Sequence, residues 1–160
     1  MKAVTIKQLK DELSHTPALD LKELCLHLAR FKKENKELLT YLLFESHDEE
    51  FFIQNLKEEV DIQFDDINTN SFFYIRKSIR KILSSIKKHI RYSKKKETEA
   101  ELLLYFCKKL KAFKPSIVRS TRLQNIFDTQ VRMIKKAIER LHEDLQYDYQ
   151  LELDELLENE

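Results

Sequence analysis

The amino-acid sequence predicts an all-α protein, and three observations support this class. The chain of 160 residues contains no glycine and only two prolines, Pro17 and Pro115. Apolar residues recur every three to four positions through most of the chain, which is the period of an amphipathic helix. Tight hairpin turns favour glycine, so a chain without it is poorly suited to sheets. The length and the 42% apolar content predict one domain with one core.

The missing glycines also exclude several kinds of site. Glycine adopts positive φ without strain and lets a ligand approach the backbone closely. The sequence therefore contains no Walker loop, no G-x-G-x-x-G dinucleotide fingerprint, no kinase glycine loop and no G-x-S-x-G nucleophile elbow. No apolar run approaches the roughly 18 residues that a membrane span needs.

Three helices are expected in the first 45 residues. A capping box over Thr5–Gln8 opens the first helix, which ends before Pro17. Asp20 opens the second helix, and a polar turn over residues 32–35 separates it from the third. The apolar stripes are Leu9 and Leu13 in the first helix, Leu21, Leu24, Leu28 and Phe31 in the second, and Leu38, Leu39, Leu42 and Leu43 in the third.

Three further helices are expected up to Pro115. A capping box over Ser46–Glu49 opens the fourth helix, which frays within residues 63–70. The fifth is the clearest, because six aliphatic residues share one face. Thr98 caps the sixth. The stripes are Phe52, Ile53, Leu56 and Val60 in the fourth helix, Ile75, Ile79, Ile82, Leu83, Ile86 and Ile90 in the fifth, and Leu102, Leu103, Phe106, Leu110 and Phe113 in the sixth.

The seventh helix is expected over about residues 120–149. Its apolar seam repeats with 4-3-4-3-4 spacing, which is a heptad pattern shorter than the three to four heptads typical of a coiled coil. Two interpretations remain open: the seam packs within its own domain, or it is a self-association seam between two copies. The seam residues are Phe127, Val131, Ile134, Ile138, Leu141 and Leu145.

These elements predict a single all-helical domain over residues 1–149, followed by an acidic, leucine-containing tail over residues 150–160. The tail is expected as a helix end, a docked strap or a loose segment. Six to seven helices with short connections predict antiparallel hairpins arranged as a bundle. The segment 23–28 resembles the segment 101–106, and half of this 78-residue offset is close to the length of a HEAT repeat. A short HEAT-like α-solenoid therefore remains an alternative to the bundle.

Charge is strongly partitioned along the chain, although the net charge is only +1. Residues 1–70 carry 9 Lys and Arg against 15 Asp and Glu, residues 71–140 carry 20 against 5, and residues 141–160 carry none against 8. The basic block is densest over residues 76–96, where like charges at i,i+4 repel one another. We therefore list a candidate polyanion-binding face: Arg76, Lys77, Arg80, Lys81, Lys87, Lys88, Arg91, Lys94, Lys95 and Lys96.

Two kinds of group are able to offset this repulsion. The internal candidates are the acids of the preceding helix (Glu58, Glu59, Asp61, Asp65 and Asp66) and the acidic tail. The external candidates are the phosphates of a nucleic acid or an anionic membrane surface. Charge runs are by themselves poor evidence of binding. The sequence therefore favours a basic block that is neutralised within the chain or solvated.

No constellation of residues points to catalysis or to a metal. The best metal-like spacing is Glu139 and His142, but di-iron bundles need two such pairs and further inward glutamates. The paired carboxylates lie outside the apolar faces, where burial would raise their pKa values. Cys25 and Cys107 both lie in apolar stripes and are expected as reduced, buried thiols. We expect no enzyme activity, no cofactor and no metal. The N-terminus lacks the apolar core of a signal peptide, so the expected location is the cytoplasm.

Three stretches carry a resemblance to known proteins: residues 21–45 (LKELCLHLARFKKENKELLTYLLFE), residues 98–109 (TEAELLLYFCKK) and residues 141–149 (LHEDLQYDY). In these stretches the chain is similar to a set of small, uncharacterised bacterial cytosolic helical proteins with no assigned activity. The resemblance covers most of the chain, implies a helical fold and carries over no site.

Together these observations favour a non-enzymatic helical protein-interaction module, an adaptor or scaffold, whose partner is another protein or a second copy. The alternative is a nucleic-acid-binding protein that uses the basic segment 76–96. No small-molecule substrate is indicated.

Overall fold

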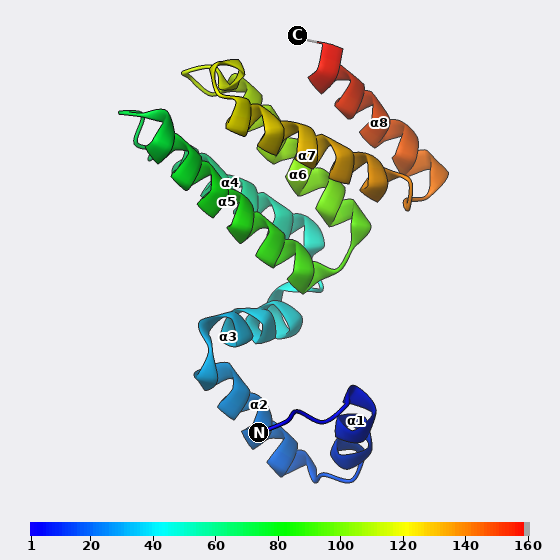
Figure 1. The fold of residues 1–160 in the computed structure, drawn as a ribbon. Helices are drawn as coiled ribbons and strands as arrows, with labels where there is room; N and C mark the ends of the chain where they lie inside the picture. The colour runs from blue at the N-terminus through cyan, green and yellow to red at the C-terminus, as the bar shows by residue number, and fades with distance from the viewer. Residues whose placement is uncertain (159–160) are drawn as a thin grey trace. The chain divides into compact units, whose positions relative to one another are not determined.

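The computed structural model describes residues 1–158, and over that range it is all-helical, as the sequence predicts (Figure 1). No strand occurs in these residues, and none of their helices is both long and apolar enough to cross a membrane. A π-helical turn at Tyr41–Glu45 precedes α4, and a 3₁₀ turn at Ile117–Arg119 precedes α7. The described α-helices are α1 (Ile6–Ser14), α2 (Ala18–Phe31), α3 (Lys33–Thr40), α4 (Glu49–Asp65), α5 (Phe72–Ser93), α6 (Lys96–Ala112), α7 (Thr121–Ile138) and α8 (Glu143–Glu158).

The chain forms two compact units rather than the single expected domain. The N-terminal unit is Met1–Phe44 and the C-terminal unit begins at Glu45. The boundary expected after residue 149 lies inside α8, so the described part of the acidic tail is the end of a helix, with Leu153 and Leu156 buried. Residues 159 and 160 of that tail lie outside the described residues.

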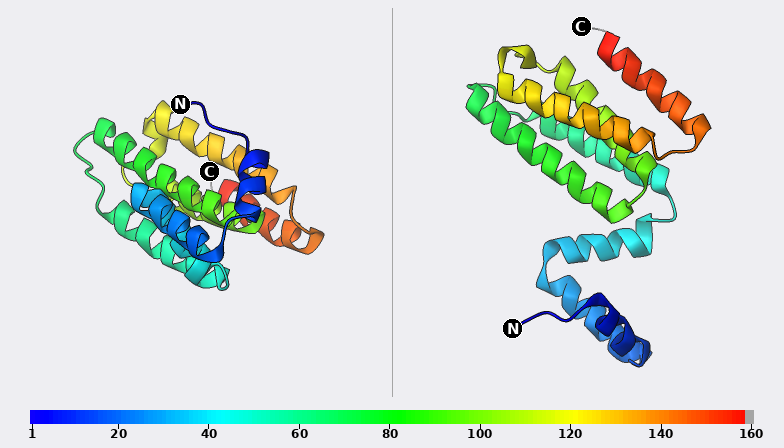
Figure 2. Two further views of the ribbon diagram at one scale, coloured as in Figure 1. Left: turned by 90° about the horizontal axis from the view of Figure 1, so that it is seen from below. Right: turned by 45° about the vertical axis from the view of Figure 1, so that its right-hand side comes forward.

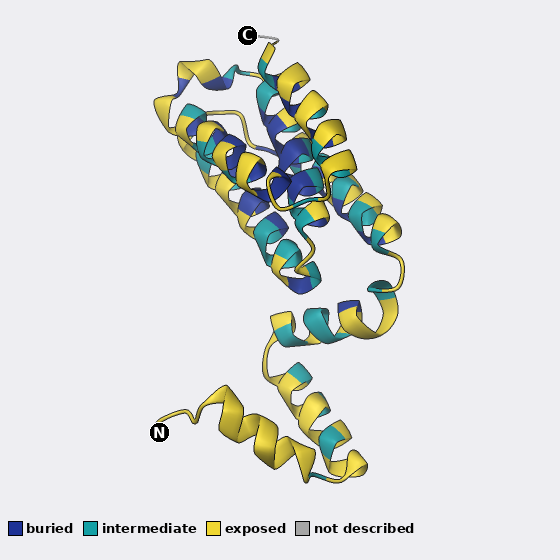
Figure 3. Ribbon diagram, turned by 90° about the vertical axis from the view of Figure 1, so that its right-hand side faces the viewer, coloured by how far each residue is buried: buried dark blue, intermediate teal, exposed yellow. Residues whose placement is uncertain are grey.

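The N-terminal unit holds α1, α2 and α3. The capping box that opens α1 is confirmed: the Gln8 amide donates to Thr5 Oγ1 at 3.3 Å, and the Thr5 amide donates to Gln8 Oε1 at 3.0 Å. α2 begins at Ala18, directly after Pro17 and two residues before the predicted start. The Asn35 side chain donates to the Leu28 carbonyl at 2.8 Å and thereby fixes the turn from α2 into α3. None of these three helices contains a buried residue (Figure 3).

The C-terminal unit is built around α6, which packs against α4, α5, α7 and α8 (Figure 2). A helix that is apolar on all sides must be covered on all sides. This applies to α6, whose buried residues include Leu102, Leu103 and Leu104 in succession. The neighbours present one apolar face each. Five of the six residues predicted for the α5 face are buried, namely Ile75, Ile79, Ile82, Leu83 and Ile86, whereas Ile90 is half-buried.

The predicted helix over residues 120–149 is wrong, because the chain turns between Ile138 and Glu143 and forms α7 and α8 separately. The eighth α-helix, against the six to seven expected, arises at this turn. The Gln146 side chain donates to the carbonyls of Glu139 at 3.1 Å and Leu141 at 2.9 Å, which satisfies backbone groups that the end of α7 leaves unpaired.

The heptad seam does not continue across this turn. Phe127, Val131, Ile134 and Ile138 are buried on α7 within the chain itself, whereas Leu141 lies in the turn and Leu145 on α8. The structure therefore contradicts a continuous self-association seam over these residues.

Candidate functional site

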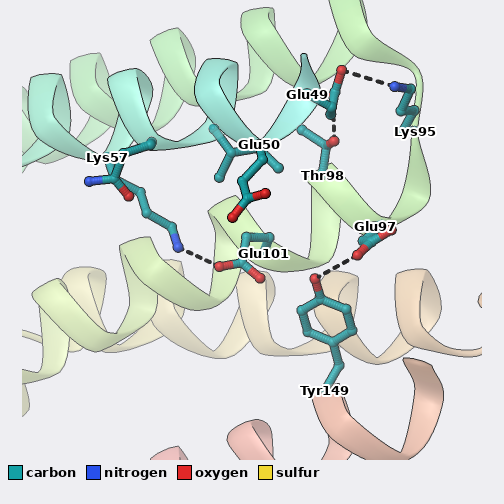
Figure 4. Close-up of a pocket in the computed structure, with 10 residues that line it drawn as sticks. Glu49, Glu50, Lys57, Lys95, Glu97, Thr98, Glu101 and Tyr149 are labelled. Atoms are coloured by element: carbon teal, nitrogen blue, oxygen red, sulfur yellow. Dashed lines mark hydrogen bonds and ion pairs between the residues drawn. The ribbon is translucent and has the colours of Figure 1, made fainter. Parts of the chain in front are cut away.

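A polar pocket lies in the C-terminal unit, where α4, α6, α8 and the connection from α5 to α6 meet (Figure 4). Its volume is about 480 Å³. The side chains that line it are Glu49, Glu50, Ile53, Gln54, Lys57, Lys95, Glu97, Thr98, Glu101 and Tyr149. Sequence reasoning did not group these residues, because they come from segments up to 100 positions apart.

Glu49 ties the start of α4 to the connection between α5 and α6. Its Oε1 accepts hydrogen bonds from Thr98 at 2.6 Å and from Ser93, and its Oε2 pairs with Lys95 Nζ at 3.1 Å (Figure 4). A carboxylate in the first turn of a helix is also stabilised by the helix dipole. Thr98 was expected to cap α6, but the helix begins at Lys96 and the buried Thr98 hydroxyl serves this tertiary contact instead.

Glu101 lines the same pocket and pairs with Lys57 (Figure 4). Burial by itself would raise the pKa of Glu101, but hydrogen bonds from Lys57 and Tyr149 and the positive charge of Lys57 outweigh it and lower the pKa below its usual range. The one proton of the Tyr149 hydroxyl is shared between Glu101 and Glu97, whose Oε1 lies 3.4 Å away. Burial and the neighbouring carboxylates raise the pKa of Tyr149 above its ordinary value.

These ionisation states suit a structural ion-pair cluster better than acid–base chemistry. A general acid or base works best with a pKa near the operating pH. Here the pKa of Glu101 is lowered and that of Tyr149 is raised, so both are displaced away from neutrality. In the described part of the chain, no three His, Cys, Asp or Glu side chains are placed to hold a metal ion together.

The candidate polyanion face is split between two helices. α5 ends at Ser93, Lys94 adopts a left-handed backbone conformation with φ of 60°, and Lys96 begins α6. Lys95 and Lys96 are paired with Glu49 and Glu99. The basic segment 76–96 is therefore not one helix: seven of its cations lie on α5, and Lys94, Lys95 and Lys96 follow the end of α5.

The cysteines and the metal-like histidine pair also differ from expectation. Cys107 is buried as predicted, and burial raises the pKa of its thiol to about 12. Cys25 is exposed, so the prediction of a buried thiol is wrong at this position. Glu139 and His142 flank the turn after α7 rather than sharing one helix face.

A second surface belongs to the N-terminal unit and was not foreseen. Of nineteen large apolar side chains that are exposed in the described residues, twelve lie in residues 1–44. An apolar groove of about 220 Å³ runs between α2 and α3. Its lining consists of Cys25, Leu28, Ala29, Asn35, Leu38, Leu39 and Leu42. The sequence indicated the apolar stripes, but nothing in it indicated that they would be left uncovered.

The comparisons with known proteins add no identification. No family model matches the chain, and no curated protein and no solved structure matches it. The fold and these surfaces are therefore the basis for a functional proposal.

Proposed function

We propose that this chain is a non-enzymatic protein-interaction module, and that residues 1–44 supply its docking surface. The observation that supports the proposal most strongly is the exposed apolar surface of the N-terminal unit, in which α1, α2 and α3 bury no residue. Folded monomers rarely expose large contiguous apolar patches unless the patch serves binding.

The exposed stripe on α2 has the spacing of a helix interface. Leu24, Leu28 and Phe31 stand at i, i+4 and i+7 and are 47%, 58% and 73% exposed. Burying a fully exposed leucine or phenylalanine is worth about 1.5–3 kcal/mol, and each of these partly exposed side chains has about half of that or more left to gain. A partner that covers this stripe therefore gains substantial binding energy from a few side chains.

The groove between α2 and α3 indicates what kind of partner fits. It is continuous with the α2 stripe through Leu28, and the hydrogen bond from Asn35 to the Leu28 carbonyl holds its two walls together. An open apolar groove between helices is the surface on which an amphipathic helix docks with anchors at i, i+3 or i+4, and i+7. We therefore propose an amphipathic helix of a protein partner as the occupant.

The test uses two variants with matched exposure. Leu24→Ser changes a side chain that is 47% exposed in the N-terminal unit, and Leu151→Ser changes one that is 46% exposed on α8. A photo-crosslinking residue placed at Leu28 in the full chain identifies the bound protein in its native cell. Binding is then measured between the two purified proteins. We expect Leu24→Ser to weaken binding severalfold, because covering the exposed half of one leucine is worth about 0.7–1.5 kcal/mol, and Leu151→Ser to leave it unchanged.

Light scattering of the purified chain distinguishes the alternative occupant. A mass near twice 19.3 kDa for the wild type, together with the monomer mass for Leu24→Ser, would show that a second copy covers the groove instead. The proposed docking surface would be contradicted if the chain is a monomer and both variants lose the same binding affinity for the partner. It would also be contradicted if the chain is a monomer and no purified protein binds it.

A further inference from the structure

One face of α5 carries a row of positive charge that the fold leaves uncovered. The helix contains seven Lys and Arg and no Asp or Glu over its 22 residues. Residues at i, i+4, i+7, i+11, i+14 and i+18 lie on a single face of a helix. This row, which we call the α5 stripe, consists of Phe73, Lys77, Arg80, Ser84, Lys87 and Arg91.

Two of the internal acids that were expected to neutralise this charge pair with lysines of α6 instead. Asp61 of α4 accepts from Tyr105 at 2.6 Å and pairs with Lys109 at 3.0 Å. Glu152 of α8 pairs with Lys108 of α6 at 2.8 Å. Within residues 1–158 no ion pair reaches Lys77, Arg80 or Arg91. The repulsion along the α5 stripe is therefore not offset by these contacts within the chain.

The α5 stripe is also shaped as a shallow groove. A depression of about 320 Å³ is lined by Arg80, Leu83, Ser84, Lys87 and Arg91. Lys87 Nζ lies 3.5 Å from Met133 Sδ of α7, so α7 flanks this part of α5. α7 itself carries four Lys and Arg against one Asp. The three cations that line the groove, Arg80, Lys87 and Arg91, all come from α5.

We propose that the α5 stripe binds the phosphate backbone of a nucleic acid. Its 18-residue span corresponds to about 27 Å of helix, long enough to meet several phosphates of one strand. Phe73 is 62% exposed at one end of the stripe and offers a face on which an unpaired base stacks. The C-terminal unit carries the whole stripe, so this proposal is independent of the docking surface on residues 1–44.

A membrane surface fits the same charges less well. A helix that lies on a membrane buries its apolar face in the lipid while its cations face the headgroups. In α5 the apolar face, with Ile75 and Ile79, is already buried within the protein. The phosphates of a nucleic-acid strand need exposed cations and no insertion of apolar side chains. They therefore match the exposed cations of α5 better than a membrane does.

The experiment measures binding of the full chain to a labelled 20-nucleotide single strand and to the matching duplex, by fluorescence anisotropy over a series of salt concentrations. Four cations on the stripe predict a slope of about −3 in log K against log salt.

Arg80→Glu with Arg91→Glu is expected to weaken binding at least tenfold and to flatten that slope by one or more. Lys10→Glu with Lys22→Glu, an equal charge change on exposed residues of the N-terminal unit, is expected to have a much smaller effect. Circular dichroism melting checks that both variants remain folded.

Phe73→Ala tests the stacking contact, and we expect it to weaken binding to the single strand more than to the duplex. Equal effects on the two probes would remove base stacking from the proposal. The proposal as a whole is overturned by absence of binding to either probe at low salt, by equal losses from the two double variants, or by binding to phosphatidylserine vesicles without binding to either oligonucleotide.

Discussion

The N-terminal and C-terminal units carry the same kind of apolar pattern and bury it very differently. On α2, Leu24 and Leu28 repeat every four residues and stay exposed; on α5, Ile75 and Ile79 repeat in the same way and are fully buried. The spacing determines which side of a helix is apolar. Whether that side is covered depends on the rest of the chain, and on α5 it packs against α6.

This contrast has an energetic consequence. Apolar side chains in the core of the C-terminal unit stabilise the fold, whereas equivalent residues on α2 contribute little until a partner covers them. Substitutions of apolar residues in the two units should therefore change the free energy of unfolding by different amounts.

The largest difference is expected between Leu103→Ala and Leu24→Ser. Leu103 is completely buried on α6, so its truncation removes apolar contacts and leaves a cavity, at a cost of about 2–5 kcal/mol in the free energy of unfolding. Leu24→Ser is expected to change that free energy by less than about 0.5 kcal/mol. Urea unfolding followed by circular dichroism measures both. Comparable losses from the two variants would show that α2 is packed as firmly as α6.

A smaller effect is expected at the pocket of Figure 4. Thr98→Val keeps the volume of the buried side chain but removes its hydrogen bond to Glu49. The loss is expected to be about 1–3 kcal/mol, because a buried polar group loses its partner. Thr40→Val is the matched control: Thr40 is exposed and its hydroxyl donates to the Lys36 carbonyl. Equal effects of the two substitutions on the urea midpoint would mean that the contact with Glu49 contributes nothing.

A still smaller effect depends on pH. The pKa of Glu101 is lowered in the folded protein, so its stabilising contribution is fully present above the ordinary glutamate pKa of about 4.3 and is lost as the pH falls through the folded value. Glu101→Gln should therefore be less stable than the wild type at pH 7, with the difference shrinking below pH 4. Urea midpoints at both pH values measure this. A difference that stays constant or grows in acid would contradict the assigned shift.

The sequence was sufficient for the class of fold and for most helices, because periodicity and end signals are local. The capping box at Thr5 and the buried face of α5 are examples of such local information. The turn at residues 139–142 was missed for the opposite reason. Leu141 and Leu145 continue the heptad spacing across it, no glycine or proline marks it, and the bonds from Gln146 that stabilise it form only after the chain has turned.

The candidate site was predictable only in part. The seven cations of α5 were identified from their density, but the lack of an ion pair at Lys77, Arg80 and Arg91 depends on tertiary contacts, such as those of Asp61 and Glu152 with lysines on α6. Thr98 and Glu49 are 49 positions apart, so their contact is a tertiary one that no local pattern encodes. The exposed groove of the N-terminal unit has no sequence signal at all, since exposure depends on which helices fail to pack on α2 and α3.

The α2–α3 groove is open in the folded chain while the α6 core is closed, and each of the two cysteines reports on one of these regions directly. Cys25 lines the groove and Cys107 is buried on α6, where the pKa of its thiol is raised to about 12. Alkylation of the dilute native protein, followed by mass spectrometry, is expected to modify Cys25 at least about 100-fold faster than Cys107, which reacts only through unfolding. Equal protection of both thiols until the protein unfolds would contradict an open groove.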